Sequence, residues 1–217
     1  MRMESAVSSK GFRRCATSLA VAAAFGVAAS APMAAIVDSG FVSINIPSDF
    51  DGIYMNWVTG VRGAPESSVP HWDFHAYDNG TPGSPKLTFY ATTFAGNNSA
   101  ILGTTVIGGV ATPLVASDVV GPAGNYVIGI VTAPGFYGTG TKTIGIEFTN
   151  EVTGMLNYGY AVIQTTAPLG FPATIIRYLY EDTGAPITVQ SFVPALTGAT
   201  SRKVHGGAGT FDLQLTP

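Results

Sequence analysis

The stretch KTIGIEF (142–148) alternates between apolar and polar or small residues. In an extended chain Ile144, Ile146 and Phe148 point to one side, and the residues between them point to the other. This two-residue period is typical of a β-strand with one buried and one open face. The stretch therefore predicts a strand that covers an apolar core.

Runs of the same kind, rich in β-branched and aromatic residues, continue on both sides of this strand. They are FVSINI (41–46), GIYMNWV (52–58), KLTFYATTF (86–94), TTVIGG (104–109), NYVIGIV (125–131), YGYAVIQ (158–164), TIIRYLY (174–180) and TFDLQLT (210–216). Segments rich in Gly, Pro, Asn and Asp separate them, as turns require, and no segment has a helical period. The sequence therefore predicts an all-β fold, an antiparallel two-sheet β-sandwich of jelly-roll-like form, as one domain over residues 36–217.

The N-terminus has the pattern of an export signal. A polar stretch with Lys10, Arg13 and Arg14 precedes the apolar run LAVAAAFGVAA (19–29). This run has the length of a signal-peptide core and falls short of the roughly 20 apolar residues that a membrane span needs. We expect residues 1–35 to be a cleaved signal peptide, with cleavage after Ala29 or Ala35, and the protein to be secreted or periplasmic. General and twin-arginine export both remain open.

Removal of the signal changes the composition in two ways. The chain's one cysteine, Cys15, leaves with it, so disulfides, thiolate metal sites and cysteine nucleophiles are excluded. Six basic and twelve acidic residues remain, which gives a net charge of −6. This charge disfavours nucleic acid and anionic membranes as partners. We also expect no membrane anchor once the signal is gone.

The stretch HWDFHAYDNG (71–80) carries three candidate metal ligands at alternate positions. In a regular strand His71, Asp73 and His75 share one face, and zinc or copper accepts such ligands. The two histidines would, however, lie about 13 Å apart, too far to share one ion unless the strand bends. We therefore predict a solvated polar strand face and no cofactor, with a metal site as the alternative.

Loop oxygens offer a second possibility for a metal. Asp49 and Asp51, and also Asp78 and Asn79, could ligate Ca²⁺. Because Asp and Asn beside Gly also form turns, turn chemistry is the preferred interpretation.

Four tyrosines form the candidate ligand site. Tyr158 and Tyr160 share one strand face, Tyr178 and Tyr180 share another, and Arg177 lies beside the second pair. On neighbouring strands, exposed tyrosines would form a platform for sugar rings. The alternative is that these side chains stabilise the sheet as cross-strand pairs.

Enzymatic motifs are missing. The sequence contains no G-x-S-x-G, H-E-x-x-H or P-loop pattern. Polysaccharide hydrolysis needs two carboxyl groups roughly 5 to 10 Å apart, and Glu147, Glu151, Glu181 and Asp182 are the available acids. We predict that the protein is not an enzyme.

Three stretches carry a family resemblance. They are VDSGFVSINIPSDFDGIYMNWVTG (37–60), VPHWDFHAYDNG (69–80) and YGYAVIQTTAPLGFPATIIRYLYEDTGAPITV (158–189). Together they resemble a family of uncharacterised secreted proteins of Gram-negative bacteria, some with a PEP-CTERM sorting tail. The resemblance implies an exported β-sandwich without an established activity. The sorting tail is missing here, and His71 and His75 stand where the family pattern has Gly and Asn, which weighs against a shared metal site.

These observations favour an exported, non-catalytic surface, matrix or binding protein. The alternatives are a carbohydrate-binding module and a polysaccharide-acting hydrolase. The expected partner is an extracellular glycan or another surface protein.

Overall fold

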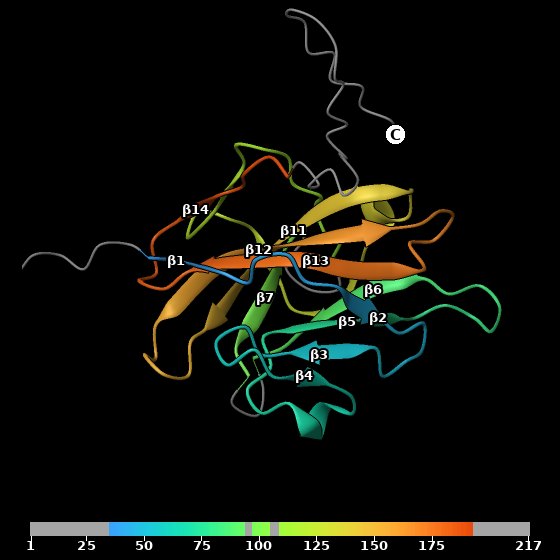
Figure 1. Ribbon diagram of the computed structural model, residues 1–217, viewed down its shortest axis with the longest axis horizontal. Helices are drawn as coiled ribbons and strands as arrows, with labels where there is room; N and C mark the ends of the chain where they lie inside the picture. Colours follow the sequence, from blue (N-terminus) through green and yellow to red (C-terminus); the bar gives the residue numbers. More distant parts are fainter. Residues whose placement is uncertain (1–34, 94–96, 105–108, 193–217) are drawn as a thin grey trace, which may run out of the picture. The chain divides into compact units, whose positions relative to one another are not determined.

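The computed structural model describes residues 35–93, 97–104 and 109–192, and these residues form an all-β structure (Figure 1). The only helical segments among them are two short 3₁₀ turns, at Glu66–Ser68 and Pro134–Phe136. The strands are β1 Ile36–Asp38, β2 Ile44–Ile46, β3 Ile53–Met55, β4 Arg62–Gly63, β5 Phe74–Asp78, β6 Leu87–Ala91, β7 Ser99–Leu102, β8 Val119–Val120, β9 Tyr126–Val127, β10 Gly129–Thr132, β11 Gly140–Thr149, β12 Leu156–Thr165, β13 Ala173–Glu181 and β14 Ile187–Thr188. No described helix is long and apolar enough to cross a membrane.

Two antiparallel sheets make up the body of the molecule. The larger has seven strands in the order β1-β13-β12-β11-β7-β9, with β2 also pairing with β13. The smaller has five strands in the order β10-β6-β5-β3-β4. The predicted antiparallel two-sheet sandwich is confirmed.

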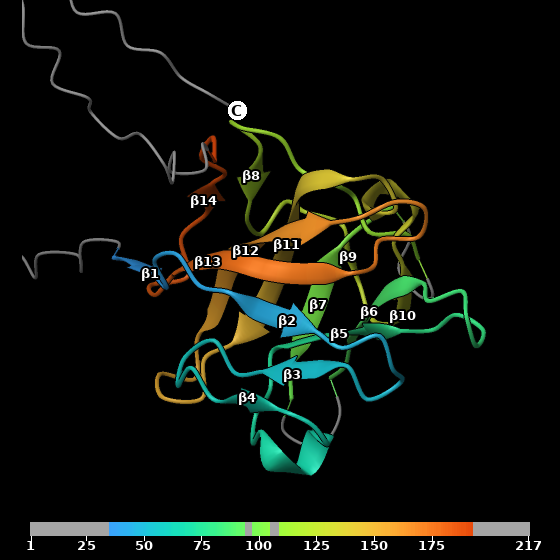
Figure 2. The same ribbon diagram turned by 45° about the vertical axis from the view of Figure 1, so that its right-hand side comes forward.

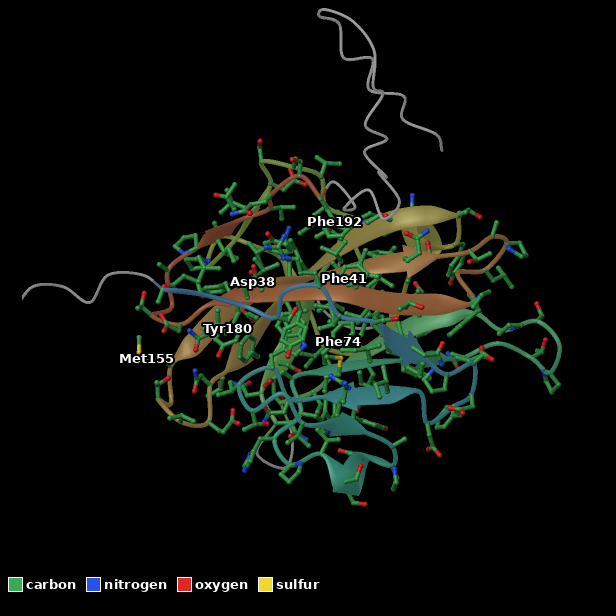
Figure 3. All side chains as sticks on the ribbon, viewed as in Figure 1. Asp38, Phe41, Phe74, Met155, Tyr180 and Phe192 are labelled. Carbon is green, nitrogen blue, oxygen red and sulfur yellow. The ribbon has the colours of Figure 1, made fainter. Side chains whose placement is uncertain are left out.

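The core lies between these two sheets. The stretch 142–148 forms most of β11, and its predicted inner residues Ile144, Ile146 and Phe148 are all 0% exposed. From the five-stranded sheet, Phe74 enters the same cluster (Figure 3). Phe89 joins it, and both side chains are 0% exposed. Burying one such side chain stabilises the fold by about 1.5–3 kcal/mol. The inner positions predicted along 142–148 are therefore confirmed. The other face is not open, because Thr143 and Gly145 are also buried and Leu114 and Val120 lie over Gly145.

A short third layer lies on the outer side of the seven-stranded sheet. This layer is the two-stranded β8–β14 sheet. In Figure 2 it lies on one side of β12 and β13, and strands β3 and β4 of the five-stranded sheet lie on the other side. Val120 and Ile187 of this layer pack in a second, smaller apolar cluster, which Phe192 joins on the side of β13 away from Phe74 (Figure 3). We call the sheet surface under this layer the covered face; it carries Tyr158, Tyr160, Val162 and Leu179.

One strand prediction splits in two. The run 125–131 contains β9 of the seven-stranded sheet and β10 of the five-stranded sheet, with only Ile128 between them. Gly129 has φ of +82°, a left-handed conformation that side chains disfavour. This glycine turns the chain from one sheet to the other without a loop.

The N-terminal edge also differs from the prediction. Of the run 41–46 only Ile44–Ile46 is a strand, and Ile36–Asp38, which was not predicted, forms β1. Both pair with the same edge of β13, β1 with 179–181 and β2 with 173–175. The predicted strand 210–216, most of 104–109 and all but the last residue of the predicted signal peptide lie outside the described residues.

Candidate functional site

The four tyrosines of the predicted glycan platform do not share a surface. β12 and β13 are neighbours, but their register pairs Tyr160 with Leu179 and Gly159 with Tyr180. Since directly paired residues point to the same side of a sheet, Tyr180 points away from Tyr160. Tyr158 and Tyr160 lie on the covered face, and Tyr178 and Tyr180 face the core between the sheets.

The burial of three of these tyrosines also contradicts the predicted glycan platform. Tyr158, Tyr160 and Tyr180 are only 5%, 2% and 4% exposed. The backbone N–H of Gln190 donates to the hydroxyl of Tyr160 at 3.3 Å, which ties the C-terminal end of the third layer to the sheet. These residues stabilise packing and cannot stack on a sugar.

Arg177 has a structural partner. Its guanidinium forms a two-pronged ion pair with Asp38 of β1, in which Nε donates to Oδ1 at 2.9 Å and Nη2 donates to Oδ2. The hydrogen bond from Arg177 lowers the pKa of Asp38. The pair holds β1 on the edge of β13, so Arg177 is not a free ligand-binding group.

The predicted metal ligands are separated. Strand β5 begins at Phe74, and His71 before it is exposed, with φ of +52°. Asp73 and His75 are 3% and 4% exposed, so the predicted solvated strand face is wrong. The regular alternation assumed from sequence does not extend through 71–73. No group of three or more His, Cys, Asp or Glu residues able to hold a metal ion occurs among the described residues.

Asp73 lies just before β5 and is hydrogen-bonded to the segment that follows β3. Its Oδ2 accepts a hydrogen bond from the backbone N–H of Trp57 at 2.7 Å. Glu151, in the turn between β11 and β12, accepts one from Asn56 Nδ2 at 2.8 Å. Burial raises the pKa of Asp73 to about 8, and the charge of Glu151 adds to this effect. Two neighbouring residues, Asn56 and Trp57, thus hold one acid from each sheet.

The other predicted catalytic acids are apart from this pair. Glu181 is buried and accepts hydrogen bonds from Thr183 and the Ala185 N–H within its own turn. Asp182 accepts one from the Ala35 N–H at 3.2 Å. Glu147 lies on the outer side of β11. Asp73, which sequence analysis considered only for the alternative metal site, is the acid whose pKa the charge of Glu151 raises.

His75 lies on the outer side of the five-stranded sheet, between two tyrosine rings. Its ring stacks on Tyr54 at 3.8 Å and on Tyr77 at 4.7 Å, with interplanar angles of 8° and 12°. Nε2 lies 3.0 Å from the carbonyl oxygen of Asp51, which can only accept, so Nε2 carries the proton. Burial lowers the pKa of His75 to about 4. The imidazole is therefore neutral and acts as an aromatic ring in a stack.

The stack belongs to a longer row of rings. Phe50 packs edge-on against Tyr77 at 5.6 Å, and Trp72 packs edge-on against Tyr54 at 5.3 Å. Tyr90 of β6 lies beside the row, 6.0 Å from Trp72 and directly paired with His75. We call the surface formed by Phe50, Tyr54, Trp72, His75, Tyr77 and Tyr90 the aromatic face. No second sheet of the described residues packs on it.

Most ring faces in this row are packed against other rings, and Trp72, His75 and Tyr77 are only 1%, 4% and 3% exposed. The surface open to a ligand therefore comes from Phe50 and from the edges of Tyr54 and Tyr90. The hydroxyls of Tyr54, Tyr77 and Tyr90 make no hydrogen bond to any residue within the described ranges. Burial, with the nearby charges of Glu66 and Asp51, raises the pKa of Tyr54 to about 12, and burial raises the pKa of Tyr77. Both phenols remain protonated at neutral pH and can donate hydrogen bonds.

A depression lies at each end of the row. Beside Phe50, which is 74% exposed, a cavity of about 430 Å³ is lined by Ser48, Asp78, Asn79 and Thr81 among others. Beside Trp72, a shallower one of about 560 Å³ is lined by residues that include Glu66, His71 and Asn97. The arrangement suits an elongated polar ligand that lies along β5.

Part of this face can be predicted from alternation in the sequence. In GIYMNWV (52–58) and KLTFYATTF (86–94), Tyr54 and Tyr90 alternate with core residues such as Met55 and Phe89, and this places them on the outer side. Phe50 had no such signal because it precedes the strand.

Comparison with protein-family models, with curated proteins and with solved structures finds no match to this chain.

Proposed function

We propose that this is an exported, non-catalytic binding protein that holds a polysaccharide chain along the aromatic face. The observation that carries the proposal is the row of rings with unpaired tyrosine hydroxyls between two depressions. Sugars are bound by aromatic surfaces that offer both apolar contact and hydrogen bonds.

The two kinds of contact come from different parts of the row. Phe50 is the ring that exposes most of its surface, so a sugar ring would stack there, above Asp78 and Asn79. Tyr54 and Tyr90, which are only partly buried, would donate to hydroxyl groups farther along the same chain. The N-terminal signal pattern supports a location outside the cytoplasm, where such polymers occur.

Hydrolysis of the polymer has weaker support. The acids that approach one another are Asp73 and Glu151, and Asp73 is only 3% exposed. A substrate bond would have to reach a buried carboxyl group, so binding without cleavage fits the site better.

Affinity electrophoresis through gels that contain soluble polysaccharides, preceded by a glycan array, tests the proposal. We expect the purified exported protein to be retarded by at least one polymer, and Phe50→Ala to weaken the affinity about tenfold, as loss of a stacking contact of about 1.4 kcal/mol implies. The matched control is Phe41→Ala, which removes a ring that is 73% exposed and lies outside the row.

Equal retardation of the Phe50 and Phe41 variants would overturn the placement of the site. Binding of a surface protein in place of every glycan tested would overturn the ligand class. Release of reducing ends from a bound polymer would overturn the non-catalytic role.

A further inference from the structure

A second site lies on the other sheet, at the margin of the covered face. Glu147 is on the outer side of β11, paired with Tyr158 of β12 and Ala100 of β7. The third layer reaches the same strand two residues earlier, where Val120 lies directly over Gly145. Glu147 is therefore half-buried beside that layer.

The carboxylate of Glu147 has no partner among the residues that the structure describes. Within the described parts of the chain, it is the only buried or half-buried carboxylate with no hydrogen bond or ion pair to another described residue. Glu181, by contrast, accepts hydrogen bonds from Thr183 and Ala185. Burial raises the pKa of Glu147. A buried negative charge without a partner is costly and is stabilised by a cation.

Glu147 opens onto a cavity of about 240 Å³. Tyr126, Asn98 and Leu156 also line it. The rings of Tyr126 and Tyr158 are 6.1 Å apart, and the hydroxyl of Tyr126 already donates to the carbonyl of Gly121 at 3.0 Å. The tyrosine therefore contributes its ring to the cavity, and the charge comes from Glu147.

We propose that this pocket binds an organic cation, a primary ammonium or a guanidinium group, on the Glu147 carboxylate and against the ring of Tyr126. Charge-assisted hydrogen bonds to a carboxylate and attraction to a tyrosine ring both favour such a group. A volume of 240 Å³ accommodates it together with a short alkyl stem. A metal ion fits less well, because the pocket offers a single carboxylate.

The cation can come from a free amine or from a lysine or arginine side chain of another protein. The pocket lies on the seven-stranded sheet and the aromatic face on the five-stranded sheet, so this site is independent of polysaccharide binding. Its ligand and its test are separate from those of the proposed function.

The experiment titrates the exported protein with n-butylammonium, n-butylguanidinium and neutral n-butanol, and follows the ring resonances of Tyr126 and the side-chain carboxyl of Glu147 by NMR. N-acetyl-lysine methylamide and N-acetyl-arginine methylamide serve as protein-side-chain probes. We expect millimolar binding of the cations and none of butanol. Tighter binding of the peptide probes would assign the cation to a protein, and tighter binding of the free amines would assign it to a small molecule.

Two variants test the role of the carboxylate. Glu147→Gln keeps the side-chain shape and should weaken cation binding about tenfold or more, which corresponds to 1.4 kcal/mol. The matched control Asp51→Asn removes an exposed carboxylate outside the pocket and should leave binding unchanged. A shift of the Glu147 pKa back toward its ordinary value on binding would add support. The proposal is overturned if no cation perturbs Tyr126, or if Glu147→Gln binds as well as the native protein.

Discussion

The outer faces of the two sheets carry similar side chains and have different fates. On the seven-stranded sheet, Tyr158 and Tyr160 lie beneath β8 and β14 and form part of a second apolar cluster. On the five-stranded sheet, Tyr54 and Tyr90 remain partly exposed, although Trp72, His75 and Tyr77 of the same face are only 1–4% exposed because rings pack on one another. The difference shows that the exposure of a tyrosine at an outward strand position depends on which segment passes over it.

Truncation of one tyrosine on each face gives the largest expected contrast. Tyr160→Ala removes a ring that is 2% exposed and should lower the free energy of unfolding by about 3–5 kcal/mol. Tyr90→Ala should cost under about 1.5 kcal/mol, since the ring is half exposed. Urea denaturation measures both. Equal losses would mean that the two faces are packed alike.

Weakening the third layer comes next in size. Ile187→Ala, at a side chain that is 4% exposed, should destabilise by about 2–3 kcal/mol and leave polysaccharide binding unchanged. It should also speed hydrogen exchange at β8, whose partner strand is β14. If exchange at β5 accelerated equally, the layer would not be a separate unit.

The pH dependence separates the two buried groups at the start of β5. Asp73 has a raised pKa, so its contribution to stability falls as pH rises from about 4 to about 8. His75 has a lowered pKa, so its contribution falls as pH drops from about 6.5 to about 4. Below pH 6.5 the contributions of the two groups to the free energy of unfolding change in opposite directions with pH. Above pH 6.5 only the contribution of Asp73 still changes. Asp73→Asn should therefore remove a loss of about 1–2 kcal/mol between pH 6.5 and 8.

Melting curves across this pH range, with His75→Phe as the paired variant, measure the effect. His75→Phe should leave the alkaline slope in place and remove the acid one. An alkaline slope that persists in Asp73→Asn would contradict a protonated Asp73.

The smallest effect is expected at the edge of the seven-stranded sheet. Arg177→Met should cost at most about 1 kcal/mol, because the ion pair with Asp38 is about one-third exposed. The loss should shrink in high salt, measured by urea denaturation. A much larger loss would mean that β1 stabilises the sheet more than its exposed residues indicate.

Much of the fold could be predicted from the sequence because alternation reports burial directly. Along 142–148 the alternation identifies each core position without any knowledge of strand pairing. Alternation also showed that Tyr158 and Tyr160 share a face. It could not show which face, since that depends on the register with β13, and a shift by one residue reverses it.

The candidate site was less predictable for a related reason. The metal hypothesis assumed a regular strand through 71–75, but the backbone turns at His71, and Asp73 and His75 point into different surroundings. The aromatic face is assembled from three strands and two loops, so no single stretch of sequence displays it.

The crossing at Gly129 has a consequence for how the molecule bears load. The segment before Gly129 is hydrogen-bonded to β7, and the segment that begins at Gly129 is hydrogen-bonded to β6. Only Ile128 lies between the two strands. Force that pulls the two layers apart is therefore shared by a covalent corner as well as by side-chain packing. Under the proposed function, in which the protein holds a long polymer, such a corner would add mechanical strength.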